Sequence, residues 1–416
     1  MKKILLFELC LLLLATNFQS DNPPGWYQQT LPVNDFVNDI FFIDTLTGWV
    51  VTQGHTNNQD TAYIMKTTNG GDNWTVQYSR NMNMTTVQFT DHQTGYVGGA
   101  SGTGTIYVLK TTNGGDNWIQ IMGTTAGTQV DDMFFLNSDT GWICDSPNLI
   151  GFGLIKTTNG GLNWFQQLDN SYRPLRVHFI NADTGWMGTN EANGRLYRTT
   201  NGGNNWELQY THSSGILDVY FFNANIGILT SGLNLKTTNG GFNWESTNDG
   251  GGKISMGNDS VGWAGRIFSN IVKTTNQGTT WFVQTTPIFN NSNVYAVDEN
   301  TCFAGGSGIV KTTDGGGPTS IFQINNTLPN VFDLFQNYPN PFNPTTNIKF
   351  NITSITEVRL KIYDSQGKEI KQLINEKLPP GEYNFLFDGT NLTSGIYFYR
   401  LEASDFMSTR KMVLIK

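Results

Sequence analysis

The sequence predicts an all-β protein in which a seven-bladed β-propeller, closed by an N-terminal strand, precedes a small C-terminal β-sandwich. The first observation is a phrase close to Lys-Thr-Thr-Asn-Gly-Gly-x-Asn-Trp, which recurs through most of the chain. The second is the composition, with 46 Gly, 13% aromatic and only 14% charged residues, which favours short strands and tight turns over amphipathic helices. The third is that the phrase ends before Pro318 and a tail of alternating segments follows.

The phrase marks a structural repeat. Its copies lie 44, 46, 42, 38, 37 and 38 residues apart and begin at Lys66, Lys110, Lys156, Arg198, Lys236, Lys273 and Lys311. A period of this length is typical of a small unit that cannot bury its apolar face alone and stacks on copies of itself.

Each repeat is predicted to form four antiparallel strands. In the second repeat these are Thr85–Asp91, Gly95–Gly99, Thr105–Thr112 and Asn117–Met122. The Asn113-Gly114 pair between the last two strands tolerates the positive φ angles of a tight hairpin turn. Four strands in about 40 residues are typical of a propeller blade.

The two ends of the repeat region predict how the ring closes. The seventh copy, Lys311–Gly316, has no Trp and no fourth strand after it, whereas Gly25-Trp26-Tyr27-Gln28-Gln29 matches the fourth-strand phrase at Asn163–Gln167. We therefore expect the N-terminal strand to complete the seventh blade; an open solenoid capped by this strand is the alternative. Seven tryptophans should pack between blades as structural residues: Trp26, Trp74, Trp118, Trp164, Trp206, Trp244 and Trp281.

The sequence also predicts export and the order of the domains. Lys2 and Lys3 precede an apolar run that is too short to span a membrane, so residues 1–20 are expected to be a secretory signal peptide. The propeller is expected over 21–317, a linker over 318–331 and the sandwich over 332–416. Without the signal the net charge is −9, from 23 basic and 32 acidic residues, which disfavours nucleic acid as a partner. Cys144 and Cys302 should be free, buried thiols.

Thr67–Trp74 resembles the Asp-box, or bacterial neuraminidase repeat, except that six of the seven copies carry Asn where the pattern has Asp and only Asp314 keeps it. Together with Thr-Gly-Trp, as at Thr47–Trp49, the repeat is similar to the propellers of photosystem II assembly and stability factors. The resemblance implies the propeller fold, with the Asp-box turns on the face opposite the usual binding face.

The tail resembles the C-terminal sorting domain of type IX secretion. The residues that carry this resemblance are Asn337–Pro344, Ile362-Tyr363-Asp364 with Gly367, Ser394–Tyr399 and Lys411–Lys416. The resemblance implies the type IX machinery as a partner and a secreted or outer-surface location; an adhesin-like sandwich is the alternative. The expected strands of the sandwich are Asn347–Phe350, Glu357–Asp364, Gly381–Asp388, Gly395–Ala403 and Lys411–Ile415.

Two sets of polar residues are candidates for binding. One set starts the first strand of every blade and should encircle the mouth of the central channel, although strand starts can also simply be solvated. Its members are Asp39, Thr86, Asp132, Arg176, Asp218, Lys253 and Asn293. The other set is the cation that begins each repeat phrase, which we expect to be a solvated edge position that discourages aggregation, with a docking surface as the alternative.

The sequence favours a non-catalytic surface or extracellular module that binds a glycan or a protein at the channel mouth. The few scattered Arg and Glu residues do not supply the arginine clamp and acids of a sialidase, and fold alone does not carry chemistry. The four histidines lack metal-ligand spacing, so we assign no catalytic residue, cofactor, metal or membrane span. The alternative is an extracellular glycoside hydrolase of Asp-box type that uses Asp39, Asp132 and Asp218.

Overall fold

The computed structural model describes residues 25–54, 61–102, 104–124, 129–145, 152–247, 251–266, 271–284, 286–288, 290, 293–316, 321–325, 329–354, 356–378, 380–389 and 392–416. The expected signal peptide, 1–20, lies outside these ranges. The described part of the chain contains no helix that is long and apolar enough to cross a bilayer.

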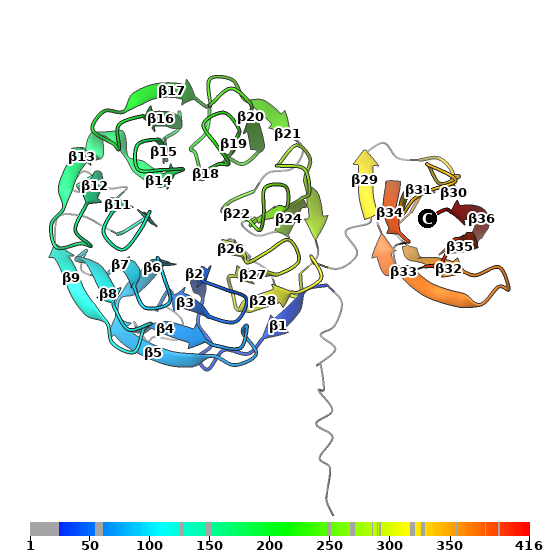
Figure 1. Ribbon diagram of the computed structural model, residues 1–416, viewed down its shortest axis with the longest axis horizontal. Helices are drawn as coiled ribbons and strands as arrows, with labels where there is room; N and C mark the ends of the chain where they lie inside the picture. Colours follow the sequence, from blue (N-terminus) through cyan, green and yellow to red (C-terminus); the bar gives the residue numbers. More distant parts are fainter. Residues whose placement is uncertain are drawn as a thin grey trace, which may run out of the picture.

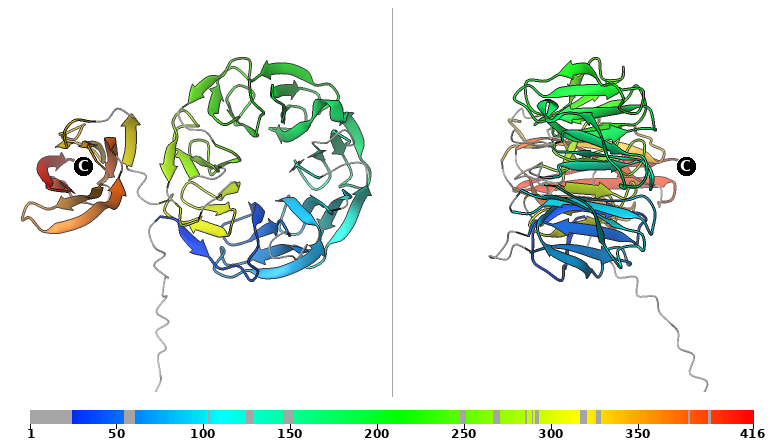
Figure 2. Two further views of the ribbon diagram at one scale, coloured as in Figure 1. Left: turned by 180° about the vertical axis from the view of Figure 1, so that it is seen from behind. Right: turned by 90° about the vertical axis from the view of Figure 1, so that its left-hand side faces the viewer.

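The predicted seven-bladed propeller is confirmed: seven four-stranded antiparallel sheets surround a common centre, with the first strand of each blade innermost (Figure 1). Edge-on, the seven blades form a single layer (Figure 2). Blades 1 to 3 consist of β2 (Val37–Phe42), β3 (Gly48–Thr52), β4 (Thr61–Thr67) and β5 (Thr75–Asn81); β6 (Asn83–Phe89), β7 (Gly95–Ala100), β8 (Ile106–Thr111) and β9 (Ile119–Thr124); and β10 (Asp132–Phe135), β11 (Gly141–Cys144), β12 (Leu154–Thr157) and β13 (Phe165–Leu168).

Blades 4 to 6 follow the same order, and a 3-10 turn at Asn170–Tyr172 precedes blade 4. Their strands are β14 (Pro174–Phe179), β15 (Gly185–Thr189), β16 (Arg195–Thr199) and β17 (Glu207–Thr211); β18 (Asp218–Phe221), β19 (Gly227–Thr230), β20 (Asn234–Thr237) and β21 (Glu245–Thr247); and β22 (Ile254–Met256), β23 (Gly262–Ala264), β24 (Ile271–Thr274) and β25 (Phe282–Gln284).

Blade 7 combines both ends of the repeat region. Its inner strands are β26 (Asn293–Ala296), β27 (Cys302–Gly305) and β28 (Ile309–Thr312), and its outer strand is β1 (Tyr27–Gln29). Gly25 N–H donates to Asp314 Oδ2 at 2.9 Å, the same bond that Asn73 N–H makes to Asn69 Oδ1 at 3.0 Å within blade 1. The closing strand therefore reproduces an Asp-box bond between segments far apart in the sequence, which accounts for the seventh copy continuing at the N-terminus.

Stacked aromatic rings fill the contacts between blades. At five of the seven junctions the second-strand aromatic of one blade stacks on the first-strand Phe of the next, as for Trp49 on Phe89 at 3.5 Å and Trp186 on Phe221 at 3.6 Å between ring centroids. In the Thr-Gly-Trp phrase the glycine leaves room for the first-strand ring, since a Cβ at Gly48 would lie 2.5 Å from Phe42. Among the Asp-box tryptophans, Trp26, Trp74 and Trp281 are buried, whereas Trp118, Trp164, Trp206 and Trp244 are half-buried. Much of the contact between blades thus comes from the second-strand aromatics.

The cations that begin the repeat phrases link the blades. Lys66 Nζ lies 5.3 Å from the centroid of Trp49 and donates to Gly114 O of the next blade at 2.8 Å. The five other lysines of the set likewise donate to a carbonyl of the following repeat turn: Lys110, Lys156, Lys236, Lys273 and Lys311. We expected these cations to be solvated edge residues, and that expectation was wrong. A cation that is partly shielded from water is stabilised by its contact with the ring and by its hydrogen bond to the carbonyl of the next blade.

The C-terminal sandwich packs two sheets around one apolar core. One sheet has the order β29 (Ile321–Asn325), β34 (Gly381–Asp388), β31 (Thr345–Ile352) and β30 (Asp333–Leu334). The other has the order β33 (Glu369–Leu378), β32 (Thr356–Tyr363), β35 (Gly395–Ala403) and β36 (Phe406–Leu414). The expected linker 318–331 therefore contains a strand, because the run Ile321–Asn325 pairs with the edge of β34.

Cys144 and Cys302 are free and buried, as predicted. Burial raises the pKa of the Cys144 and Cys302 thiols well above the ordinary value, so both stay protonated and unreactive near neutral pH.

Candidate functional site: the mouth of the channel

Three aspartates of the predicted channel-mouth set bind the next blade instead of facing the opening. Asp39 Oδ2 accepts the Val87 N–H at 3.0 Å, and Asp132 Oδ2 accepts the Val177 N–H at 3.0 Å. Asp218 Oδ2 accepts the Ile254 N–H at 2.6 Å. These carboxylates therefore join blades 1 to 2, 3 to 4 and 5 to 6.

At the remaining contacts between neighbouring blades, the bond is made by the first-strand side chain that lies two residues after the predicted channel-mouth residue. Gln88 Nε2 donates to Phe135 O at 2.9 Å, and His178 Nε2 lies 3.1 Å from Phe221 O. Ser255 Oγ accepts the Ala296 N–H at 2.9 Å, and the Tyr295 hydroxyl donates to Phe42 O at 2.7 Å. We call these seven contacts the junction bonds. They alternate between two strand positions around the ring, except that blades 6 and 7 both use the second position.

His178 makes its junction bond pH-dependent. Burial lowers its pKa from 6.5 to about 4, so the folded protein keeps the ring neutral while the unfolded chain takes up a proton. Stability is then full above pH 6.5 and is lost as the pH falls toward 4, by up to about 1.4 kcal/mol per pH unit. We expect His178→Gln, which copies Gln88, to remove this loss. Urea unfolding of both proteins at pH 7 and pH 5 measures it, and parallel pH profiles would contradict the assignment.

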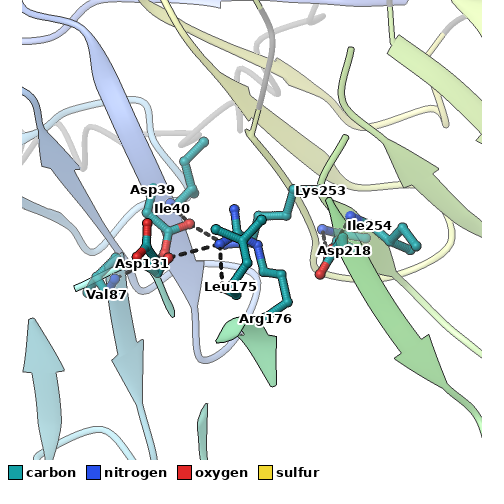
Figure 3. A network of polar contacts seen from close by, with 11 residues as sticks. Asp39, Ile40, Val87, Asp131, Leu175, Arg176, Asp218, Lys253 and Ile254 are labelled. Carbon is teal, nitrogen blue, oxygen red and sulfur yellow. Dashed lines mark hydrogen bonds and ion pairs between the residues drawn. The ribbon is translucent and has the colours of Figure 1, made fainter. Parts of the chain in front are cut away.

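In the view of Figure 3, two cations of the set, Lys253 and Arg176, lie between Asp39 and Asp218. Lys253 Nζ pairs with Asp39 Oδ1 at 2.5 Å, joining blades 6 and 1, and Arg176 donates to the carbonyls of Asp131 and Leu175 at 2.9 Å each. Burial opposes the charge on Lys253, but Asp39 outweighs it and raises the lysine pKa above its ordinary value. Burial raises the pKa of Asp132 to about 6, although Arg176 and the Val177 N–H act in the opposite direction.

The open part of the mouth is a cavity of about 330 Å³. Arg176, Lys253 and Asn293 of the predicted set line it, whereas Asp39, Thr86, Asp132 and Asp218 are not among its lining residues. Most of the other lining residues lie just before a first strand or one position before a predicted residue. The other lining residues are Asn38, Asn83, Thr85, Gln129, Val130, Asp131, Leu175, Leu217 and Gly252. The alternation of a strand explains the offset, because adjacent side chains point to opposite sides.

Two of the three aspartates of the predicted set already use both carboxylate oxygens in hydrogen bonds. Both oxygens of Asp39 and both of Asp218 already accept hydrogen bonds. The described residues that line the cavity supply amides, a hydroxyl, two cations, one carboxylate and a few aliphatic side chains. Among the described residues, no three His, Cys, Asp or Glu side chains are grouped so that they could hold a metal ion.

Seven four-stranded sheets, a ring closed by the N-terminal strand and a polar channel mouth define a closed seven-bladed β-propeller. The family model for the photosynthesis system II assembly factor YCF48 matches residues 75–337, and the chain belongs to this family. A second model, the secretion system C-terminal sorting domain, matches residues 336–416. No curated protein matches the chain.

Solved structures share the fold at low identity. YCF48 from Cyanidioschyzon merolae is 17% identical with a TM-score of 0.55, covering 70% of this chain and 98% of its own. A structure titled YCF48 bound to D1 peptide is 17% identical with a TM-score of 0.56 and the same coverage. PorZ, described as a surface component of the type IX secretion system of Porphyromonas gingivalis, is 13% identical with a TM-score of 0.53; the match covers 93% of this chain and 60% of PorZ.

The sorting domain places the protein outside the cell. Such domains mark proteins that the type IX system secretes to the cell surface or the medium, so the tail interacts with that machinery. The predicted location at the cell surface or outside the cell is thereby confirmed.

Proposed function

We propose that the protein is a non-catalytic surface propeller that binds a polypeptide segment of another protein at its channel mouth. The observation that carries this proposal is the division of the predicted set. The aspartates are used to hold the blades together, while amides and cations face the cavity.

The lining matches the chemistry of a peptide chain. Side-chain amides such as Asn38, Gln129 and Asn293 can donate to and accept from peptide groups, and Leu175 and Leu217 offer apolar contact between them. The relative titled YCF48 bound to D1 peptide supports a peptide ligand for this fold.

The glycoside hydrolase alternative finds less support. A general acid and a base must be able to reach the glycosidic oxygen and a water or the sugar itself. Asp39 and Asp218 are nearly buried, at 3% and 9% exposure, and are saturated by hydrogen bonds. Turnover of polysaccharide or sialoside substrates would support the hydrolase, since a binding module retains its ligand without product.

The test of the proposed function is selection of peptides from a display library by the purified chain. We expect Leu217→Arg, which places a long charged side chain in the cavity, to lower the affinity of selected peptides at least tenfold, about 1.4 kcal/mol. Leu46→Arg is the matched control because Leu46 is 57% exposed in a turn far from the lining residues. Equal binding by both variants, or failure to select any peptide, would overturn the proposal.

A further inference from the structure

The repeats provide internal controls, and the junction between blades 4 and 5 departs from them at three positions on the outer rim. The x position of the repeat phrase is Asp72, Asp116, Asn204 or Thr279 in four copies and Leu162 in another, but it is Phe242 in blade 5. The second residue after the Asp-box Trp is Leu208 in blade 4, whereas it is Gln120 in blade 2, Gln166 in blade 3 and Ser246 in blade 5, and the smaller Val76 and Val283 in blades 1 and 6. The cation is Arg198 in place of lysine. Departures gathered at one place indicate a local role.

The three departures line one cavity. Arg198, Leu208 and Phe242 enclose a space of about 190 Å³ together with Asn205, Glu207 and Gln209. Phe242 is 64% exposed and Leu208 is 55% exposed, so the phenyl ring and the leucine present apolar surface to solvent at a position that is polar in most copies. We call this cavity the rim site.

Arg198 departs from the other cations in its contacts as well as its identity. Its guanidinium lies 5.3 Å from the centroid of Trp186, as the lysines lie over their own rings. Arg198 Nε, however, is buried without a hydrogen-bond partner, whereas the corresponding Lys156 donates to Gly202 O at 2.8 Å. Replacing lysine by arginine thus leaves the buried Nε without a partner, and the Arg198 side chain instead lines the rim site.

We propose that the rim site binds one sugar residue of a surface glycan. The C–H face of a pyranose ring is apolar and packs on an aromatic face, here Phe242, with Leu208 beside it. Its hydroxyls both donate and accept, and the cavity is lined by a guanidinium, a carboxylate and three amides, which supply both roles. A space of about 190 Å³ accommodates a single ring and is below the usual range for larger ligands.

This site is separate from the channel mouth and does not depend on the function proposed for it. No lining residue is common to the two cavities. A chain with both sites would hold a glycan at its rim while the mouth engages a protein.

The test is retention of the purified full chain on an array of immobilised mono- and oligosaccharides. We expect Phe242→Asp and Leu208→Gln, both of which restore residues found in other copies, to lower retention about tenfold or more. Leu162→Asp is the matched control, because Leu162 is 79% exposed at the equivalent position of blade 3 and lines neither cavity. No retention of the unaltered chain, or equal loss in the control, would overturn the proposal.

Arg198→Lys gives a second readout that a merely structural residue would not show. We expect it to weaken glycan retention and at the same time raise the melting temperature, because lysine can donate to the next blade as Lys156 does. Unchanged retention in this variant would remove Arg198 from the site. Retention of peptides in place of sugars, with the same sensitivity to Phe242→Asp, would overturn the carbohydrate assignment.

Discussion

Deleting residues 25–30 will abolish cooperative unfolding of the propeller. The deletion leaves β28 with an unpaired edge and removes Trp26, whose ring is 8% exposed and whose Nε1 donates to Gln284 Oε1 at 3.0 Å. Loss of such a ring alone costs about 3–5 kcal/mol, a large part of the 5–15 kcal/mol typical of a folded domain. Thermal unfolding followed by tryptophan fluorescence should become broad and begin at lower temperature.

A control variant and a synthetic peptide test whether the effect of the deletion is due to loss of the closing strand. Gln28→Ala alters an exposed side chain of the same strand and should melt like the unaltered chain. A synthetic peptide of residues 25–32, added to the deleted protein, should restore a sharp transition, since it can re-form β1. A deleted chain that melts as sharply and as late as the full chain would show that closure does not stabilise the ring.

Lys253→Met is expected to destabilise the propeller by about 3–5 kcal/mol. Its partner Asp39, with a side chain only 4% exposed, would keep a buried negative charge without the cation that neutralises it. The double variant Asp39→Asn with Lys253→Met removes both charges and should recover most of the loss. Urea unfolding of the four proteins of this cycle gives the coupling energy between the two side chains.

The C-terminal domain contains a matched control for this pair. Lys361 Nζ and Glu369 Oε2 are 3.0 Å apart on the surface of the sandwich, where water screens the charges. Lys361→Met should therefore leave the midpoint of unfolding nearly unchanged. If Lys253→Met were equally harmless, the contact across the channel would contribute nothing to the stability of the ring.

Repeats made the fold predictable from sequence. The spacing of the phrase and the match between Gly25–Gln29 and Asn163–Gln167 predicted the blade count and the closure, because a missing strand and a spare strand can be recognised by sequence alone. The sandwich was less readable. Strand β33 was not predicted because a bulge at Leu373 places Leu373 and Ile374 both in the core and breaks the alternation.

The site was only partly predictable. A strand start shows which residues are polar, but whether a side chain faces the channel or the neighbouring blade depends on a partner about 45 residues away, as for Asp39 and Val87. The roles of the cations were missed for the same reason, since Gly114, which accepts from Lys66, belongs to the following repeat. A comparison among the repeats would have indicated the rim site, because Arg198 and Phe242 depart from otherwise similar copies.

The alternation of the junction bonds has a consequence for how this ring can change in size. A blade that bonds to the next one through an aspartate is followed by a blade that uses the second strand position, so these two blades form a pair. Adding or removing such a pair preserves the alternation, whereas adding a single blade would place two blades with the same kind of junction bond side by side. With an odd number of blades, the alternation must break at one junction. It breaks at blade 7, whose Tyr295 hydroxyl bonds to Phe42 O and in which the N-terminal strand β1 pairs with β28. The contacts of this ring therefore repeat every two blades, with blade 7 as the exception.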